Sequence, residues 1–160
     1  MWIVCGGQTG VDRAALEVAL AHGIPYGGWC PRGGWAEDFS QPPGLLARYP
    51  QLRETPSRDP AQRTAWNVRD SDATLLIRLR GGAAASPGAD LTEASAQELG
   101  RPIAVIRLSD EALAAACLLL AELPRDGALN VAGPRESEAP GIQARSRGLL
   151  EQVLARVRSS

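Results

Sequence analysis

The stretch Trp2-Ile3-Val4-Cys5-Gly6-Gly7-Gln8-Thr9-Gly10-Val11-Asp12-Arg13 decides the fold, because it places a glycine-rich turn between an apolar strand and a helix. Glycines let the backbone of such a turn come close to a ligand. The free N–H groups of the first helical turn then point at the ligand, with the positive end of the helix dipole behind them. The turn therefore predicts an anion site, and phosphate is its first candidate.

The rest of the chain alternates between helical and strand patterns. Apolar residues recur with helical spacing over residues 11–23, where Thr9 is a candidate cap and Gly23 a stop. Strands are predicted over residues 24–29, 73–77, 103–106 and 128–132, and further helices from residue 60, over 90–99, over 110–123 and over 141–157. Because the strands are too apolar for an exposed sheet, the pattern predicts an α/β fold with a mostly parallel sheet of about five strands flanked by helices.

The composition limits the function. All 17 basic residues are arginines, so there is no lysine for a P-loop, a Schiff base or pyridoxal chemistry. Arginine retains the bidentate grip on phosphate or carboxylate. A formal charge of −1 and a pI near 5.9 argue against a nonspecific nucleic-acid binder or a membrane-surface binder, since both need a net basic face.

Cysteine and histidine are few. The three cysteines, Cys5, Cys30 and Cys117, form no CxxC pair, and His22 is the only histidine. We therefore expect neither a zinc site nor a disulfide framework, and no metal site. A reducing compartment suits such a chain, and no apolar run approaches the ~20 residues of a membrane span. The expectation is a soluble cytoplasmic protein.

Polar, glycine-rich loops follow several of the predicted strands. In a parallel sheet, ligands bind beyond the carboxyl ends of the strands, so we expect residues 6–13, 28–38 and 81–93 to converge on one pocket. A fourth polar loop, residues 130–137, adds Arg135 at the same edge. The long irregular stretch over residues 32–58 is expected to cover the ligand.

Some residues in these loops have two interpretations. Asp12 is either a first-turn acid favoured by the helix dipole or an acceptor for the ribose or heterocycle of a ligand. Cys5 and Cys30 could offer sulfur to a soft metal, although partly buried thiols are commoner. Glu37 and Asp38 are interpreted as solvated loop charges. The aromatic residues around these loops either pack beneath the long loop or stack on a flat heterocycle: Trp29, Trp35, Tyr49 and Trp66.

Five ordered motifs make the chain resemble a known family over residues 5 to about 150. They are Gly6-Gly7-Gln8-Thr9-Gly10-Val11-Asp12-Arg13-Ala14-Ala15, Gly28-Trp29-Cys30-Pro31, Glu54-Thr55-Pro56-Ser57, the segment from Arg63 to Thr74, and Asn130-Val131-Ala132-Gly133-Pro134-Arg135-Glu136-Ser137. Together they resemble the molybdenum cofactor carrier proteins, within the Rossmann-like superfamily that also holds the lysine-decarboxylase-like phosphoribohydrolases.

The resemblance implies a single Rossmann-like domain over residues 1–160 that carries or stores a small phosphorylated, nucleotide-like cofactor, the molybdenum cofactor (molybdopterin). It also implies a homo-oligomer, a dimer or a tetramer, without a membrane partner. In this resemblance Arg13, Arg32, Arg63 and Arg135 are anion contacts. The residues expected to bind the cofactor are Gly6, Gly7, Gln8, Thr9, Gly10, Val11, Asp12, Arg13, Trp29, Cys30, Arg32, Arg63, Asn67, Gly88, Thr92 and Arg135.

The related hydrolases provide an alternative function, the hydrolysis of a nucleotide or nucleotide sugar. These hydrolases have a PGGxGTxxE loop and an arginine upstream of it, and Arg63 resembles that arginine in its position along the chain. Residues 81–93 lack the glycine-threonine pair, which leaves Glu93 or Asp12 to handle the proton. This degenerate loop favours binding over catalysis, and no catalytic residue is assigned.

Overall fold

Five parallel strands form the central sheet, in the order β2-β1-β7-β5-β6. The computed structural model describes residues 1–79, 86–109 and 111–158. The strands of this sheet are β1 (Trp2–Val4), β2 (Tyr26–Gly27), β5 (Ala73–Arg78), β6 (Ile103–Arg107) and β7 (Ala128–Ala132). The arrangement is Rossmann-like and confirms the predicted parallel α/β sheet.

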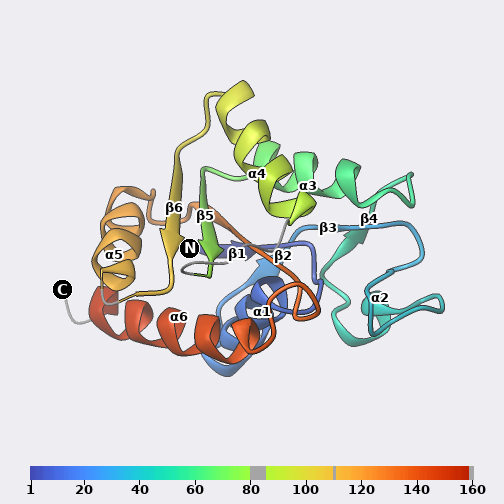
Figure 1. Ribbon diagram of the computed structural model, residues 1–160, viewed down its shortest axis with the longest axis horizontal. Helices are drawn as coiled ribbons and strands as arrows, with labels where there is room; N and C mark the ends of the chain where they lie inside the picture. Colours follow the sequence, from blue (N-terminus) through green and yellow to red (C-terminus); the bar gives the residue numbers. More distant parts are fainter. Residues whose placement is uncertain (80–85, 110, 159–160) are drawn as a thin grey trace.

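Helices cover both faces of the sheet. The layer formed by α1 (Val11–Ala21), α5 (Ala112–Glu122) and α6 (Ile142–Arg158) lies on one face, and α3 (Pro60–Arg69) packs with α4 (Pro87–Glu98) on the other (Figure 1). The N-terminus of α3 follows the predicted chemistry, with Pro60 as its first residue and the Asp59 side chain accepting a hydrogen bond from Ala61 N. Among the described helices, none is both long and apolar enough to cross a membrane.

The last strand, β7, lies in the middle of the sheet. Asn130 of β7 is level with Val4 of β1 on one side and with Thr74 of β5 on the other. Its buried side chain donates a hydrogen bond to Thr74 Oγ1 at 3.2 Å, which ties β7 to β5. The chain runs from β1 to β2 at one edge of the sheet and from β5 to β6 at the other edge, so the strand order reverses near β7. Open parallel sheets bind ligands beyond the carboxyl ends of the strands at such a point, which here means β1, β7 and β5.

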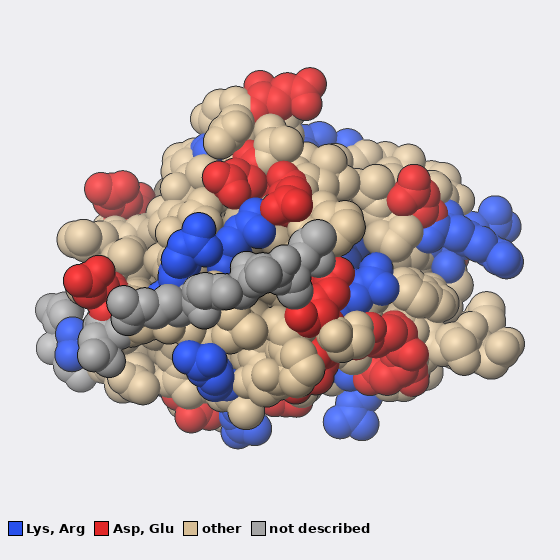
Figure 2. All heavy atoms as spheres, in the orientation of Figure 1, with Lys and Arg blue, Asp and Glu red and all other residues tan. Residues whose placement is uncertain are grey.

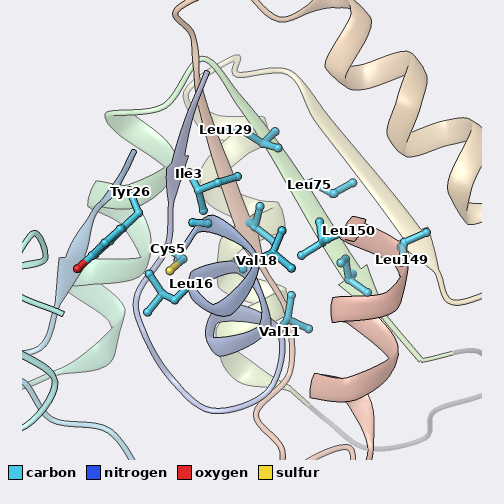
Figure 3. Packing of buried hydrophobic residues seen from close by; sticks show 14 of the residues in the cluster. Ile3, Cys5, Val11, Leu16, Val18, Tyr26, Leu75, Leu129, Leu149 and Leu150 are labelled. Atoms are coloured by element: carbon cyan, nitrogen blue, oxygen red, sulfur yellow. The ribbon is translucent and has the colours of Figure 1, made fainter. Parts of the chain in front are cut away.

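The main core lies between the sheet and the layer of α1 and α6. Figure 3 shows Leu75 and Leu129 from the sheet facing Val11 and Val18 of α1, with Leu150 of α6 beside them. All five side chains are buried. Burying an apolar side chain of this size stabilises the fold by about 1.5–3 kcal/mol, so this packing fixes the opening loop, which joins β1 to α1, against the sheet.

The single strand predicted over residues 24–29 is wrong. The chain instead forms β2 in the main sheet and β3 (Trp29–Cys30) in a second sheet. Gly28 separates them with a φ of 120°, and a Cβ there would lie 2.9 Å from Asn67 Oδ1 and clash with the carbonyl of Cys5. The close approach of three chain segments at Gly28 therefore breaks the strand.

The long stretch after Cys30 is not wholly irregular. It contains α2 (Leu45–Arg48) and β4 (Arg53–Glu54), and β4 pairs with β3 in parallel. Tyr49 and Leu45 of this stretch are fully or almost fully buried. Residues 32–58 therefore belong to the packed body of the molecule and extend its core past β2.

Candidate functional site

A cleft of about 270 Å³ opens at the carboxyl edge of β1, β5 and β7. Among the described residues, its walls come from the opening loop, the first turn of α3, the start of α4 and the loop between β7 and α6. Of the four loops predicted to converge, residues 6–13, 81–93 and 130–137 contribute to this cleft, whereas none of residues 28–38 lines it. Residues 81–85 of the third loop lie outside the described part of the chain.

Arg63 is the central cation of the cleft. It stands on the first turn of α3, and its Nη1 donates a hydrogen bond to Asp12 Oδ2 at 3.3 Å. Its Nε is buried and has no hydrogen-bond partner among the described residues. A buried donor without a partner costs about 1–3 kcal/mol, so Arg63 retains a hydrogen-bonding capacity that the described residues do not meet.

Gly6 makes room for this arginine. A Cβ on Gly6 would lie 2.6 Å from Arg63 Cζ, well inside van der Waals contact. The N–H of Gly6 donates to Asp12 Oδ2 at 3.0 Å, the same oxygen that accepts from Arg63. The guanidinium therefore lies directly against the backbone of the opening loop, and only glycine permits that contact.

Asp12 holds the loop and the arginine together. Its carboxylate is almost fully buried, and burial raises its pKa while the charge of Arg63 opposes that shift. Asp12 is an acid in the first turn of α1, as one interpretation predicted, and its carboxylate accepts hydrogen bonds from Gly6 and Arg63, while the residue does not line the cleft. Asp12 is an internal anchor for the cleft.

The opening loop is tied down by the protein itself. Its N–H groups donate hydrogen bonds to protein oxygens: Gly6 to Asp12, Thr9 to Gln8, Gly10 to Gln143 and Val11 to Pro134. Thr9 does not cap α1, since Gly10 is the N-cap and Thr9 Oγ1 is bonded to Glu37 and Glu136. From this loop Gln8 lines the cleft.

Like α3, the helix α4 has its N-terminus at the cleft. Ser86 precedes it, Pro87 is its first residue and Gly88 follows, and all three line the cleft. The first N–H groups of a helix lack partners within the helix and carry its positive dipole end. The helix N-termini at this cleft are thus those of α3 and α4, whereas the sequence pattern predicts an anion site at the start of α1.

Arg135 and Glu138 complete the wall on the β7 side. The Arg135 guanidinium lies over the ring of Trp35, 5.3 Å from its centre, while Arg135 also lines the cleft. Glu138 accepts hydrogen bonds from Arg135 N and from Ser86 Oγ, both at 2.9 Å. Ser86 and Glu138 were missed from the sequence, although a serine before a proline at a helix start is a recognisable signal.

Arg13 is not placed as an anion contact. It forms a bidentate pair with Asp38 at 2.7 and 2.9 Å and donates to the carbonyl of Gly7, and it is buried. Glu37 and Asp38 are exposed loop charges, as interpreted from the sequence, but Asp38 also accepts from Arg13 and Glu37 from Thr9 and Ser137. The hydrogen bonds from Arg13 lower the pKa of Asp38, and those from Ser137 and Thr9 lower the pKa of Glu37 against the effect of burial.

Other predicted residues hold the frame around the cleft. Asn67 accepts from Trp29 N at 2.7 Å and donates to Trp29 O at 2.9 Å, so its side chain mimics a strand partner. Cys30 is buried, which raises its pKa to about 11. Thr92 Oγ1 donates to Gly88 O at 2.8 Å inside α4. Arg32 is exposed in a neighbouring groove.

The carboxylate residues in the described part of the cleft are Asp59 and Glu138, whereas Glu93 and Asp12 do not line it. Glu93 pairs with Arg78 at 3.2 Å, beside the pair of Arg78 with Asp90. The described residues contain no cluster of three or more histidine, cysteine or acidic side chains that could hold a metal ion. On the face shown in Figure 2, arginines and carboxylates are interspersed, without a continuous basic surface among the described residues.

Comparison with known proteins identifies the family. Residues 3–154 match the model of the circularly permutated YpsA SLOG family. A crystal structure of a "putative molybdenum carrier protein" from Syntrophus aciditrophicus SB aligns with a TM-score of 0.80 and 39% sequence identity, covering 96% of this chain and 94% of that one. No curated protein matches the chain. The chain therefore belongs to the circularly permutated YpsA SLOG family.

Proposed function

We propose that the chain binds a phosphorylated, nucleotide-like cofactor in this cleft, and that the cofactor is molybdopterin, the molybdenum cofactor, which the protein carries or stores. The observation that carries the proposal is the buried Nε of Arg63, which lacks a partner among the described residues. Arg135 and the N-terminus of α4 face the same space. A guanidinium donor, a second arginine and free helix N–H groups are a suitable set for a phosphate.

Similarity to a solved structure named a molybdenum carrier protein supports the choice of ligand. When bound, the cofactor would supply the metal and its redox chemistry, and Arg63 and Arg135 would hold its phosphate. The molybdenum need not touch protein in this arrangement. We further propose a homo-oligomer in the cytoplasm as the working form.

The hydrolase alternative gains no support from the geometry. Glu93 is engaged by Arg78, and Asp12 is engaged by Gly6 and Arg63, so neither is placed to move a proton in the cleft. Release of free base from a panel of nucleoside monophosphates would contradict the proposal that the protein only binds.

Expression in a host that makes the molybdenum cofactor tests the proposal. The purified protein should carry molybdenum, measured by mass spectrometry, and a pterin, measured by fluorescence after oxidation. Arg135→Ala should lower both contents about tenfold or more, because it removes a charge-assisted contact without touching buried Asp12. Arg145→Ala, at an exposed position of α6 outside the cleft, is the matched control.

Two results would overturn the proposal. One is wild-type protein that carries neither molybdenum nor pterin and gives added cofactor no protection from oxidation. The other is equal loading of the Arg135→Ala and Arg145→Ala variants, which would place the ligand elsewhere.

A further inference from the structure

A second, wider groove adjoins the cleft. It measures about 740 Å³, against about 270 Å³ for the cleft, and it is lined by Arg32, Trp35, Glu54 and Arg58 among others. Small-molecule sites usually measure about 300–1,000 Å³. The cleft lies just below this range, so a ligand as large as a dinucleotide must extend out of it.

The two arginines of the groove are brought together by the small sheet. The pairing of β3 with β4 continues beyond both strands, since Thr55 N donates to Cys30 O at 2.9 Å and Arg32 N donates to Ser57 O at 3.0 Å. This ladder places Arg32 beside Ser57, the residue before Arg58. Arg32 and Arg58 thus follow the two neighbouring strands at the same end of the small sheet, and both line the groove.

The groove has unneutralised positive charge. Neither Arg32 nor Arg58 forms a side-chain hydrogen bond or ion pair with any residue in the described part of the chain, and both are exposed. Glu54 is the carboxylate in the groove, and its Oε2 accepts the N–H of Gly33 at 2.7 Å. One exposed carboxylate against two arginines leaves the groove suited to an anionic group.

The groove and the cleft adjoin each other at two points. Pro60 lines both of them. Arg135, which lines the cleft, stacks on Trp35, which lines the groove. A ligand whose phosphate contacts Arg63 and Arg135 can therefore pass Trp35 and Pro60 toward Arg32 and Arg58.

We propose that Arg32, Arg58 and Trp35 form a second subsite, which binds the second half of a dinucleotide-type ligand whose first phosphate lies in the cleft. This inference rests on the proposed function and specifies its ligand class. Arg32 and Arg58 contact an anionic group of the second half, and Trp35 offers the edge of its ring to a flat base. The protein thereby prefers a diphosphate-linked dinucleotide to a monophosphate that carries the same first half.

Flavins provide the matched probes, because they share a fused pteridine ring system. Flavin mononucleotide ends in one phosphate, and flavin adenine dinucleotide adds an adenosine phosphate to the same half. Titration calorimetry on the full chain should show the dinucleotide binding about tenfold tighter than the mononucleotide, the contribution of one or two charge-assisted contacts at an exposed site. In the Arg32→Ala/Arg58→Ala double variant, the affinity for the dinucleotide should fall to that for the mononucleotide, and the affinity for the mononucleotide should not change.

Two control variants separate the two proposals. Arg135→Ala should weaken both flavins, and Arg145→Ala should weaken neither. If the mononucleotide shows no binding that depends on Arg135, the proposed phosphate site fails, and the second subsite fails with it. If the mononucleotide binds as proposed but the dinucleotide binds no tighter, or if the double variant weakens both ligands equally, the second subsite alone is overturned.

Discussion

Replacing Gly6 with alanine tests whether the position of Arg63 determines ligand binding in the cleft. The new Cβ would lie 2.6 Å from Arg63 Cζ and 2.9 Å from Arg63 Cδ. The atoms in its way belong to a side chain, so the guanidinium can swing aside and the backbone need not move. Arg63 then loses its bond to Asp12, and its Nε leaves the position from which it would contact an anion.

The expected magnitudes follow from this movement. Loss of one charge-assisted hydrogen bond to a ligand costs about 1.5–3 kcal/mol, or about 10- to 100-fold in affinity. Loss of the Asp12 partner should lower the free energy of unfolding by about 1–3 kcal/mol, and the melting temperature by about 3–10 °C. Molybdenum and pterin content measures the first effect, and thermal unfolding followed by circular dichroism measures the second.

Gly148→Ala is the matched control, because Gly148 lies in α6 and a Cβ added there would meet nothing within 4 Å. It should retain the ligand and gain up to about 1 kcal/mol of stability, as alanine does in place of glycine within a helix. A Gly6→Ala variant that keeps wild-type loading would refute the assignment of Arg63 to the phosphate.

Two further predictions concern the surroundings of the cleft. The pKa of Asp38 is lowered by Arg13, so this pair stabilises the fold above the ordinary pKa of the carboxyl, and the contribution is lost as the pH falls through the lowered value. Asp38→Asn should therefore flatten the acid limb of the stability curve, by about 0.5–1 kcal/mol at this partly exposed pair; an unchanged acid limb would contradict the pairing. Burial raises the thiol pKa of Cys5 and Cys30, so a thiol reagent at pH 8 should label Cys117 alone in the native protein, and rapid labelling of all three thiols would contradict this packing.

The sequence was sufficient to predict the sheet because its strands are buried on both faces. Leu75, Leu76 and Ile77 are fully buried, and a continuous apolar run of this kind is typical of a parallel strand between two helical layers. The start of α3 was also predictable, since a proline at the first helical position is a local signal. Both the apolar run and the proline are local signals, because they depend only on residues close together in the sequence.

The second sheet could not be predicted for the opposite reason. β3 and β4 are two residues long, which is too short for a hydrophobic period, and their pairing joins segments far apart in the chain. The break at Gly28 likewise depends on Cys5 and Asn67, which approach it only in the folded state. Tertiary contacts decided both features.

The same distinction governs the cleft. Parallel topology predicts which loops converge, but it does not predict which donors remain free after they have converged. Gly10 N is bonded by Gln143 from α6, a partner that no local pattern indicates. Because several N–H groups of the opening loop already donate to protein oxygens, the proposed phosphate site depends on Arg63, Arg135 and the start of α4.

The glycines of the opening loop therefore have a different structural role from the glycines of a phosphate-binding loop. A Cβ on Gly10 would clash with the carbonyl of Pro134 and lie 2.9 Å from the backbone of Arg135, and a Cβ on Gly6 would displace Arg63. Both glycines therefore allow other segments to pack closely against the loop. They allow Arg63 and Arg135 to lie at the edges of one cleft, so in the proposed site the loop would contribute to anion binding mainly by positioning arginines that belong to other elements.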